Sequence, residues 1–175
     1  MSSDSPPEDA LAPGRDADDA PQDEAQEFES PPWEQLEVAL RLDSWEARFD
    51  AVAAVRRLAS FERGLADAPS DLFAHLTREA TDLRSKASRH ALDCVAACII
   101  AGAAPADADV DALADALLKR SVHDLRFVAE AGRRALHAVA GTGDVRVLDA
   151  VLKRAGTKNR ALRTLAAETA ARLVA

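Results

Sequence analysis

The sequence lacks several features that define large functional classes. It has no tyrosine, two tryptophans and five phenylalanines, so aromatic residues make up 4% of its 175 residues. It has no unbroken run of the ~20 apolar residues that a membrane-spanning helix needs, so we expect no membrane association. Its first residues are acidic and contain no apolar stretch, which excludes a secretory signal or transit peptide. Few aromatic residues and many alanines predict an all-α protein with a thin core.

Cysteines and catalytic motifs are also scarce. Cys94 and Cys98 lie four residues apart on one predicted helix, so no disulfide framework follows and a reducing cytoplasmic compartment fits best. His90 continues their stripe, but zinc normally takes four ligands and no second pair completes the set, so buried core cysteines are favoured. None of the four histidines lies in a nucleophile or zinc-protease motif. Gly141-Thr142-Gly143 lacks the preceding strand of a phosphate loop, so we predict a helix stop there. We expect no enzyme, no metal site and no cofactor.

Charge is distributed unevenly along the chain. Of its 30 acidic and 22 basic residues, residues 1–32 hold ten acids and one base, which leaves 20 acids and 21 bases in residues 33–175. Six of the eight prolines also lie in residues 1–32. Such a segment cannot bury enough apolar surface to offset its ordering entropy. We therefore predict a disordered acidic tail over residues 1–32 and one folded domain over residues 33–175.

The pattern of residues 33–175 is helical throughout. Apolar residues recur at the 3.6-residue period, and Gly, Pro, Asp and Ser separate the periodic segments, with no strand signal. Eight helices in four pairs are predicted, with approximate bounds 33–42, 45–60, 72–81, 82–101, 107–120, 124–139, 144–155 and 159–174. Asp43-Ser44 and Ser70-Asp71 are expected to cap the second and third of these helices.

The helix pairs repeat one another. Ala51, Ala91, Ala131 and Ala166 occupy equivalent positions, at spacings of 40, 40 and 35 residues. Repeats of roughly 40 residues, each a pair of helices, are typical of HEAT or armadillo proteins. A small residue lets two helices cross at ~8–10 Å between axes, although chance could place Ala there in so Ala-rich a chain. The repeat predicts an α-solenoid of about four HEAT-like helix pairs.

Cations gather at the same point of each pair, in the turn and at the start of the second helix. Equivalent turns of a solenoid line up along one edge, so these residues predict a basic ridge with an aromatic residue at one end. A cation at a helix N-terminus opposes the helix dipole at a cost of about 0.3–1 kcal/mol, and repetition of that cost indicates an acidic partner. The candidate residues are Trp45, Arg48, Arg84, Lys86, Arg89, His123, Arg126, Lys158, Asn159, Arg160 and Arg163.

Two other interpretations of these cations are weaker. Surface lysines and arginines are common, so a ridge without a function is the simplest alternative. Nucleic acid is an unsuitable partner, because the bases form one thin line and the acidic residues 1–32 would repel phosphates. An acidic protein is therefore the expected partner, and nucleic acid is not.

The same residues resemble a TOG domain, the HEAT-repeat module that binds tubulin dimers. Asp43-Ser44-Trp45-Glu46-Ala47-Arg48 is similar to the first intra-repeat turn of that fold, where a Trp packs on tubulin. Leu83-Arg84-Ser85-Lys86-Ala87-Ser88-Arg89 is similar to the second-turn motif of the CLASP and crescerin (TOG array regulator of axonemal microtubules) families. Phe127-Val128-Ala129-Glu130-Ala131 with Arg134-Ala135-Leu136, and Lys158-Asn159 with Leu162-Arg163, resemble the third and fourth repeats.

The resemblance extends from Trp33 to the C-terminus and implies a function. It places a tubulin-binding edge at the intra-repeat turns, with contacts from Trp45, Arg84, Lys86, Lys158 and Arg163. It implies a cytoplasmic protein of the microtubule cytoskeleton, of a cilium or axoneme, or of a microtubule-organising structure. TOG domains usually have six HEAT repeats, whereas this pattern yields four. The alternative is a HEAT-type scaffold that binds another acidic protein and not tubulin.

Overall fold

The computed structural model describes residues 31–61 and 65–174, and this part of the chain is all-helical. It contains eight α-helices and one short 3-10 helix, with no strand among the described residues. The predicted disorder of residues 1–32 lies outside the described residues, apart from Pro31 and Pro32. No described helix has both the length and the apolar character that crossing a membrane would require.

Each of the eight predicted helices is present. The elements are α1 (Trp33–Arg41), α2 (Trp45–Ser60), η1 (Leu65–Asp67), α3 (Leu72–Ala80), α4 (Ser85–Ile100), α5 (Asp107–Ser121), α6 (Arg126–Ala140), α7 (Val145–Ala155) and α8 (Arg160–Leu173). The prediction was wrong by two or three residues at the start of α4 and α6. Arg84 and Leu125 have extended backbones just before these helices, at ψ 104° and 113°. Each turn therefore contains residues that the periodicity had assigned to a helix.

Side chains stabilise these turns in two ways. The Ser44 hydroxyl accepts a hydrogen bond from the Ala47 N–H at the start of α2, as predicted. The Asp82 carboxylate accepts one from the Arg84 N–H (2.7 Å), which holds the turn before α4 without capping the helix itself. The predicted cap of α3 is wrong, because Asp71 makes no capping hydrogen bond and its carboxylate instead accepts one from Arg41 (2.9 Å).

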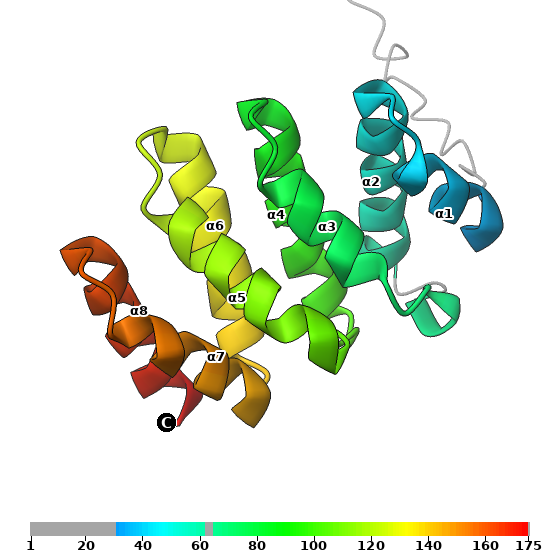
Figure 1. The fold of residues 1–175 in the computed structure, drawn as a ribbon. Coiled ribbons are helices and arrows are strands. Elements are labelled where there is room, and N and C mark those ends of the chain that lie inside the picture. Colours follow the sequence, from blue (N-terminus) through cyan, green and yellow to red (C-terminus); the bar gives the residue numbers. More distant parts are fainter. Residues whose placement is uncertain (1–30, 62–64, 175) are drawn as a thin grey trace, which may run out of the picture.

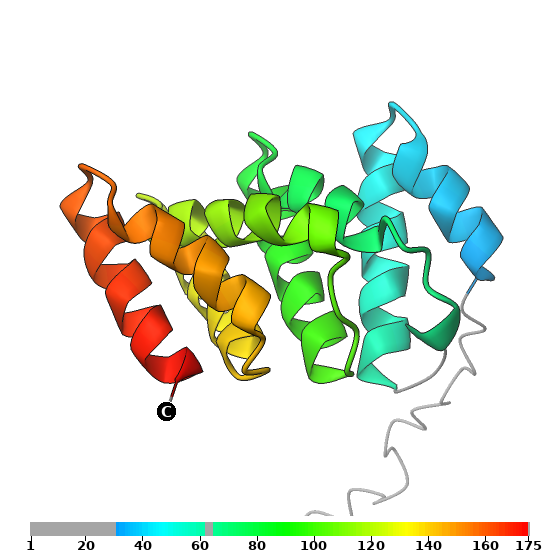
Figure 2. The same ribbon diagram turned by 60° about the horizontal axis from the view of Figure 1, so that its bottom comes forward.

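The helices are arranged in two layers (Figures 1 and 2). One layer holds α2, α4, α6 and α8 in that order, and the other holds α1, α3, α5 and α7. The two helices of each pair pack against each other, and α4 lies between α2 and α6. The turns that join α1 to α2, α3 to α4, α5 to α6 and α7 to α8 all lie along the same edge of the molecule in both views. We call this the turn edge.

Small residues allow the layers to approach each other. Ala51, Ala91, Ala131 and Ala166 are all buried, as their shared register predicted. The helices also approach closely at Gly132, where a Cβ atom would lie 2.8 Å from backbone atoms at the end of α5. The core is built mainly from Leu, Val and Ala, and among the described residues the only buried aromatic ring is that of Phe73. The molecule is therefore held together by closely packed aliphatic side chains.

Candidate functional site

The turn edge exposes apolar side chains that were not among the predicted contact residues. Leu83 is 99% exposed in the turn before α4, and Leu42 and Leu125 are exposed in the corresponding turns before α2 and α6. The predicted helix over residues 82–101 included Leu83, which is wrong because α4 begins only at Ser85. Leu83 and Leu125 each follow an aspartate directly, and this was the signal for them in the sequence. Exposed leucines among cations are suited to contact with a protein.

A contact between Trp45 and Arg84 connects the first turn to the second. Trp45 is the first residue of α2 and is 38% exposed, and its ring meets that of Phe49 edge to face, with centroids 6.4 Å apart. The guanidinium carbon of Arg84 lies 5.0 Å from the centre of the Trp45 ring, in cation–π geometry. These two predicted residues, from different helix pairs, thus form one composite surface of aromatic face and positive charge.

Arg48, another predicted contact residue, has a different environment. Its Nε lies 2.7 Å from the Glu79 carboxylate, and the two side chains are 14% and 5% exposed. Its Nη1 donates hydrogen bonds to the carbonyl oxygens of Leu42 (2.9 Å) and Asp43 (2.7 Å). Arg48 therefore links the first turn to α3 within the fold. The prediction had its guanidinium facing outward on the turn edge, and the structure does not.

Lys86 and Arg89 extend the positive charge from the turn edge onto the outer face of α4. Both are exposed. Arg89 lies 3.7 Å from the carboxylate of Asp93, which also faces Arg134 at 2.7 Å and Arg56 at 4.0 Å. Three guanidinium groups from α2, α4 and α6 thus converge on one carboxylate that is itself 11% exposed. The sequence predicted Arg89 but could not predict this convergence, because Arg56 and Arg134 each lie about 40 residues from Asp93 in the chain.

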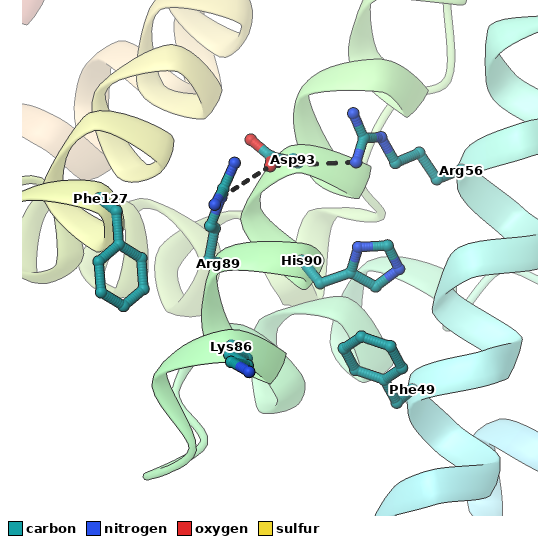
Figure 3. Close-up of a pocket in the computed structure, with 7 residues that line it drawn as sticks. All are labelled: Phe49, Arg56, Lys86, Arg89, His90, Asp93 and Phe127. Atoms are coloured by element: carbon teal, nitrogen blue, oxygen red, sulfur yellow. Dashed lines mark ion pairs between the residues drawn. The ribbon is translucent and has the colours of Figure 1, made fainter.

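A hollow of about 410 Å³ opens beside this convergence, between α2, α4 and α6 (Figure 3). Phe49 and Phe127 lie on its two sides, with Lys86 and Arg89 between them. Its lining comprises Phe49, Arg56, Lys86, Arg89, His90, Asp93 and Phe127. We call it the basic hollow. Because Lys86 lies near the start of α4, the basic hollow begins at the turn edge.

His90 forms part of the wall of this hollow. Its ring stacks on Phe49 with centroids 4.6 Å apart and an interplanar angle of 27°. Burial, followed by the positive charge of Arg56, lowers the pKa of His90 below its ordinary value. The buried Nε2 has no hydrogen-bond partner among the described residues. The neutral imidazole is therefore the favoured form, and His90 acts here as an aromatic surface.

The third and fourth turns carry four more of the predicted residues. Arg126 is exposed and pairs with Glu130 one helical turn later, at 2.7 Å. Lys158 and Arg163 are exposed, and the Asn159 side chain accepts a hydrogen bond from the Leu162 N–H at the start of α8. Asn159 therefore caps a helix, while the three cations remain on the surface. The turns between α5 and α6 and between α7 and α8 lie on the turn edge, further along the array of helices than the first two turns (Figure 1).

The two cysteines weighed as metal ligands belong to the core. Cys94 and Cys98 are fully buried in α4. A thiol–thiol hydrogen bond with Cys98 and burial raise the pKa of Cys94 well above its usual value, so its thiol stays protonated. Among the described residues, no three His, Cys, Asp or Glu side chains are grouped to hold a metal ion.

Sequence comparison adds no relative. A scan against models of protein families found no match, and a search of curated proteins found no significant one.

Proposed function

We propose that this chain is a non-enzymatic tubulin- or microtubule-binding module of the TOG type, in which the four helix pairs form a HEAT-like solenoid. The observation that carries the proposal is the alignment of all four intra-pair turns on one edge, where Trp45 and Arg84 stack at one end. The sequence motifs that resemble the TOG turns lie on that edge. The proposed location is the cytoplasm, at the microtubule cytoskeleton or a ciliary structure.

The chemistry of the turn edge supports an acidic protein surface as the partner. Exposed aromatic and leucine side chains supply apolar contact area, and buried aromatic anchors are frequent hot spots of binding energy. Cations around them steer an acidic partner and set its orientation more than they add affinity. Tubulin, as an acidic protein partner, would meet Trp45 and Leu83 with apolar groups and Arg84 and Lys86 with carboxylates.

Binding can be tested directly with the full chain. We expect it to co-sediment with microtubules, or to co-elute with free tubulin dimers in size exclusion, and to bind more weakly as salt is raised, because exposed charges are screened. The two assays distinguish a preference for the lattice from one for the free dimer. Absence of binding in both at low salt would overturn the proposal.

A second candidate function is a HEAT-type scaffold for a different acidic protein. The position of Arg48 favours it, because a residue of the first-turn motif is used inside the chain in an ion pair with Glu79. This candidate predicts no binding to tubulin, but binding to another acidic protein that is lost when Lys86 and Arg84 are reversed in charge.

A further inference from the structure

The basic hollow holds more positive charge than its own carboxylate can balance. Arg56, Arg89 and Arg134 all face Asp93, and Lys86 lines the same hollow. Only Arg134 is within hydrogen-bond distance of the carboxylate, at 2.7 Å. The guanidinium groups of Arg56 and Arg89 remain at 4.0 Å and 3.7 Å, so their hydrogen-bonding capacity toward an anion is largely unused there. Further carboxylates would fit beside them.

A second hollow of the protein lacks such an excess of positive charge. It has about 390 Å³ and lies between α5 and α7. Its two cations are already matched, because Arg146 pairs with Asp107 and Asp144, and Lys153 pairs with Asp149 at 2.8 Å and Asp111 at 3.5 Å. Only the basic hollow, of these two, combines unmatched cations with aromatic walls.

The walls of the basic hollow select among anions. Phe49, His90 and Phe127 present rings around Lys86 and Arg89 (Figure 3). A free inorganic anion would leave these rings in contact with water. An acidic peptide with apolar residues among its carboxylates would cover the rings and reach the cations together. The hollow is therefore suited to an acidic peptide.

We propose that the acidic N-terminal segment of the same chain, residues 1–30, binds in the basic hollow. Residues 1–32 hold ten carboxylates and a single base, Arg15, and include Phe28 between Glu27 and Glu29. The segment joins the chain at α1, which packs on α2, the helix that carries Phe49 and Arg56. Neighbouring helix axes are ~8–10 Å apart, and about 20 residues of coil span roughly 25 Å. The hollow is therefore within reach.

Such binding would regulate the turn edge. Lys86 belongs both to the basic hollow and to the predicted contact surface, so an acidic segment in the hollow would compete with an acidic partner for the same cation. This consequence depends on the proposed function, but binding of the segment does not. A test without tubulin therefore distinguishes failure of the proposed segment binding from failure of the proposed tubulin binding.

Zero-length carbodiimide cross-linking of the full chain tests the proposal, because it joins carboxylates only to amines that they contact. The chain has four lysines: Lys86, Lys119, Lys153 and Lys158. We expect carboxylates of residues 1–30 to link mainly to Lys86, at a yield that is unchanged by dilution and falls at high salt. Links spread evenly over the four lysines, or concentrated on Lys158, would overturn the proposal. Loss of the Lys86 link on dilution would instead assign the hollow to the tail of a second copy, and would also overturn it.

Charge variants add a matched comparison. Arg56→Glu with Arg89→Glu should lower the Lys86 link about fivefold or more, the factor equivalent to ~1 kcal/mol. Arg172→Glu, at the far end of α8 from the turn edge, should leave it unchanged. A third variant leaves the described helices unchanged: Glu24→Gln with Glu27→Gln and Glu29→Gln. It should speed acetylation of Lys86 at least about twofold, with acetylation of Lys119 as the internal reference. Equal acetylation rates would count against the proposal.

Discussion

Arg48 and Arg84 are both cations at the start of a second helix, yet their side chains have different roles. Arg48 enters the space between α2 and α3, where Glu79 and two carbonyl oxygens bind its guanidinium. Arg84 lies outside its helix and covers the Trp45 ring. At the scale of single residues, burial and the nearest acceptor decide whether a cation stabilises the fold or faces a partner.

Removing Arg48 should therefore destabilise the fold. Loss of one partner from a buried ion pair costs about 3–5 kcal/mol, and we expect Arg48→Met to lie near the lower limit because Arg78 also contacts Glu79, at 3.1 Å. Chemical denaturation would measure the free energy of unfolding. The double variant Arg48→Met with Glu79→Leu should recover most of the loss. A stable single variant with weakened tubulin binding would show that Arg48 is a contact residue after all.

Replacing Trp45 should instead weaken binding more than it weakens the fold. Truncation of an interface aromatic costs ~2 kcal/mol or more of binding energy, so Trp45→Ala should weaken tubulin binding at least ~30-fold. Trp45 is exposed, whereas Trp33 is half-buried against the core. We therefore expect Trp45→Ala to lower the melting temperature less than Trp33→Ala does. If Trp45→Ala unfolds the protein and Trp33→Ala does not, then Trp45 is a core residue and the proposed contact is wrong.

At the scale of elements, the close contact between α5 and α6 depends on a glycine, Gly132. A Cβ atom on Gly132 would lie 2.8 Å from the backbone of Arg120 and Ser121. Alanine normally favours a helix by about 1 kcal/mol over glycine, but overpacking typically costs about 1–3 kcal/mol. Gly132→Ala should therefore destabilise the protein in thermal unfolding. Gly156→Ala is the matched control, since a Cβ atom there would meet no other part of the described structure within 4 Å, its chain neighbours aside. It should be neutral or slightly stabilising.

The packing of α4 on α2 should make stability depend on pH. Burial lowers the pKa of His90 in the folded protein, and burial with the charge of Arg172 lowers that of His137. As the pH falls below the ordinary histidine value of 6.5, the unfolded chain binds protons that the folded rings resist, so stability declines between about pH 7 and pH 5. His90→Phe keeps a ring against Phe49 and should flatten that decline in denaturation series. Identical slopes would contradict this account of His90.

A separate loss of stability is expected at lower pH. A hydrogen bond from Arg41 lowers the pKa of Asp71, and one from Arg146 lowers that of Asp144. Their contribution is present above the unfolded value of 3.8 and is lost as the pH falls below it. The histidine and carboxylate effects therefore occupy different pH ranges and can be told apart in one series.

At the scale of the whole molecule, the balance of charge should control association. Reversing Arg84 and Lys86 to Glu removes two positive charges from the turn edge and adds two negative ones. Exposed charges contribute at most ~1 kcal/mol each to stability. We expect steeply weaker tubulin binding at low salt and an almost unchanged melting temperature. Arg172→Glu reverses a charge far from the turn edge and should bind nearly as well as the wild type. Equal tubulin binding by the double variant would contradict the proposed role of Arg84 and Lys86 as contact residues.

The sequence by itself determined the helices and their pairing. Apolar periodicity and the residues of the turns are local signals, so eight helices and the buried alanines at a shared register could be predicted. The N-termini of α4 and α6 were misplaced because Asp82 and His123 bind the backbone two residues later and extend each turn. Periodicity alone does not report such a competition between local hydrogen bonds.

Only the tertiary structure decided which side chains meet. Arg56, Arg89 and Arg134 come from three helices, and nothing in their local sequence indicates that they face one carboxylate. The inward position of Arg48 likewise depends on Glu79, 31 residues away. Helix periodicity is encoded within a few residues, whereas ion pairs and hollows depend on how separate helices are brought together. The candidate edge was therefore predictable in outline, and the basic hollow beside it was not.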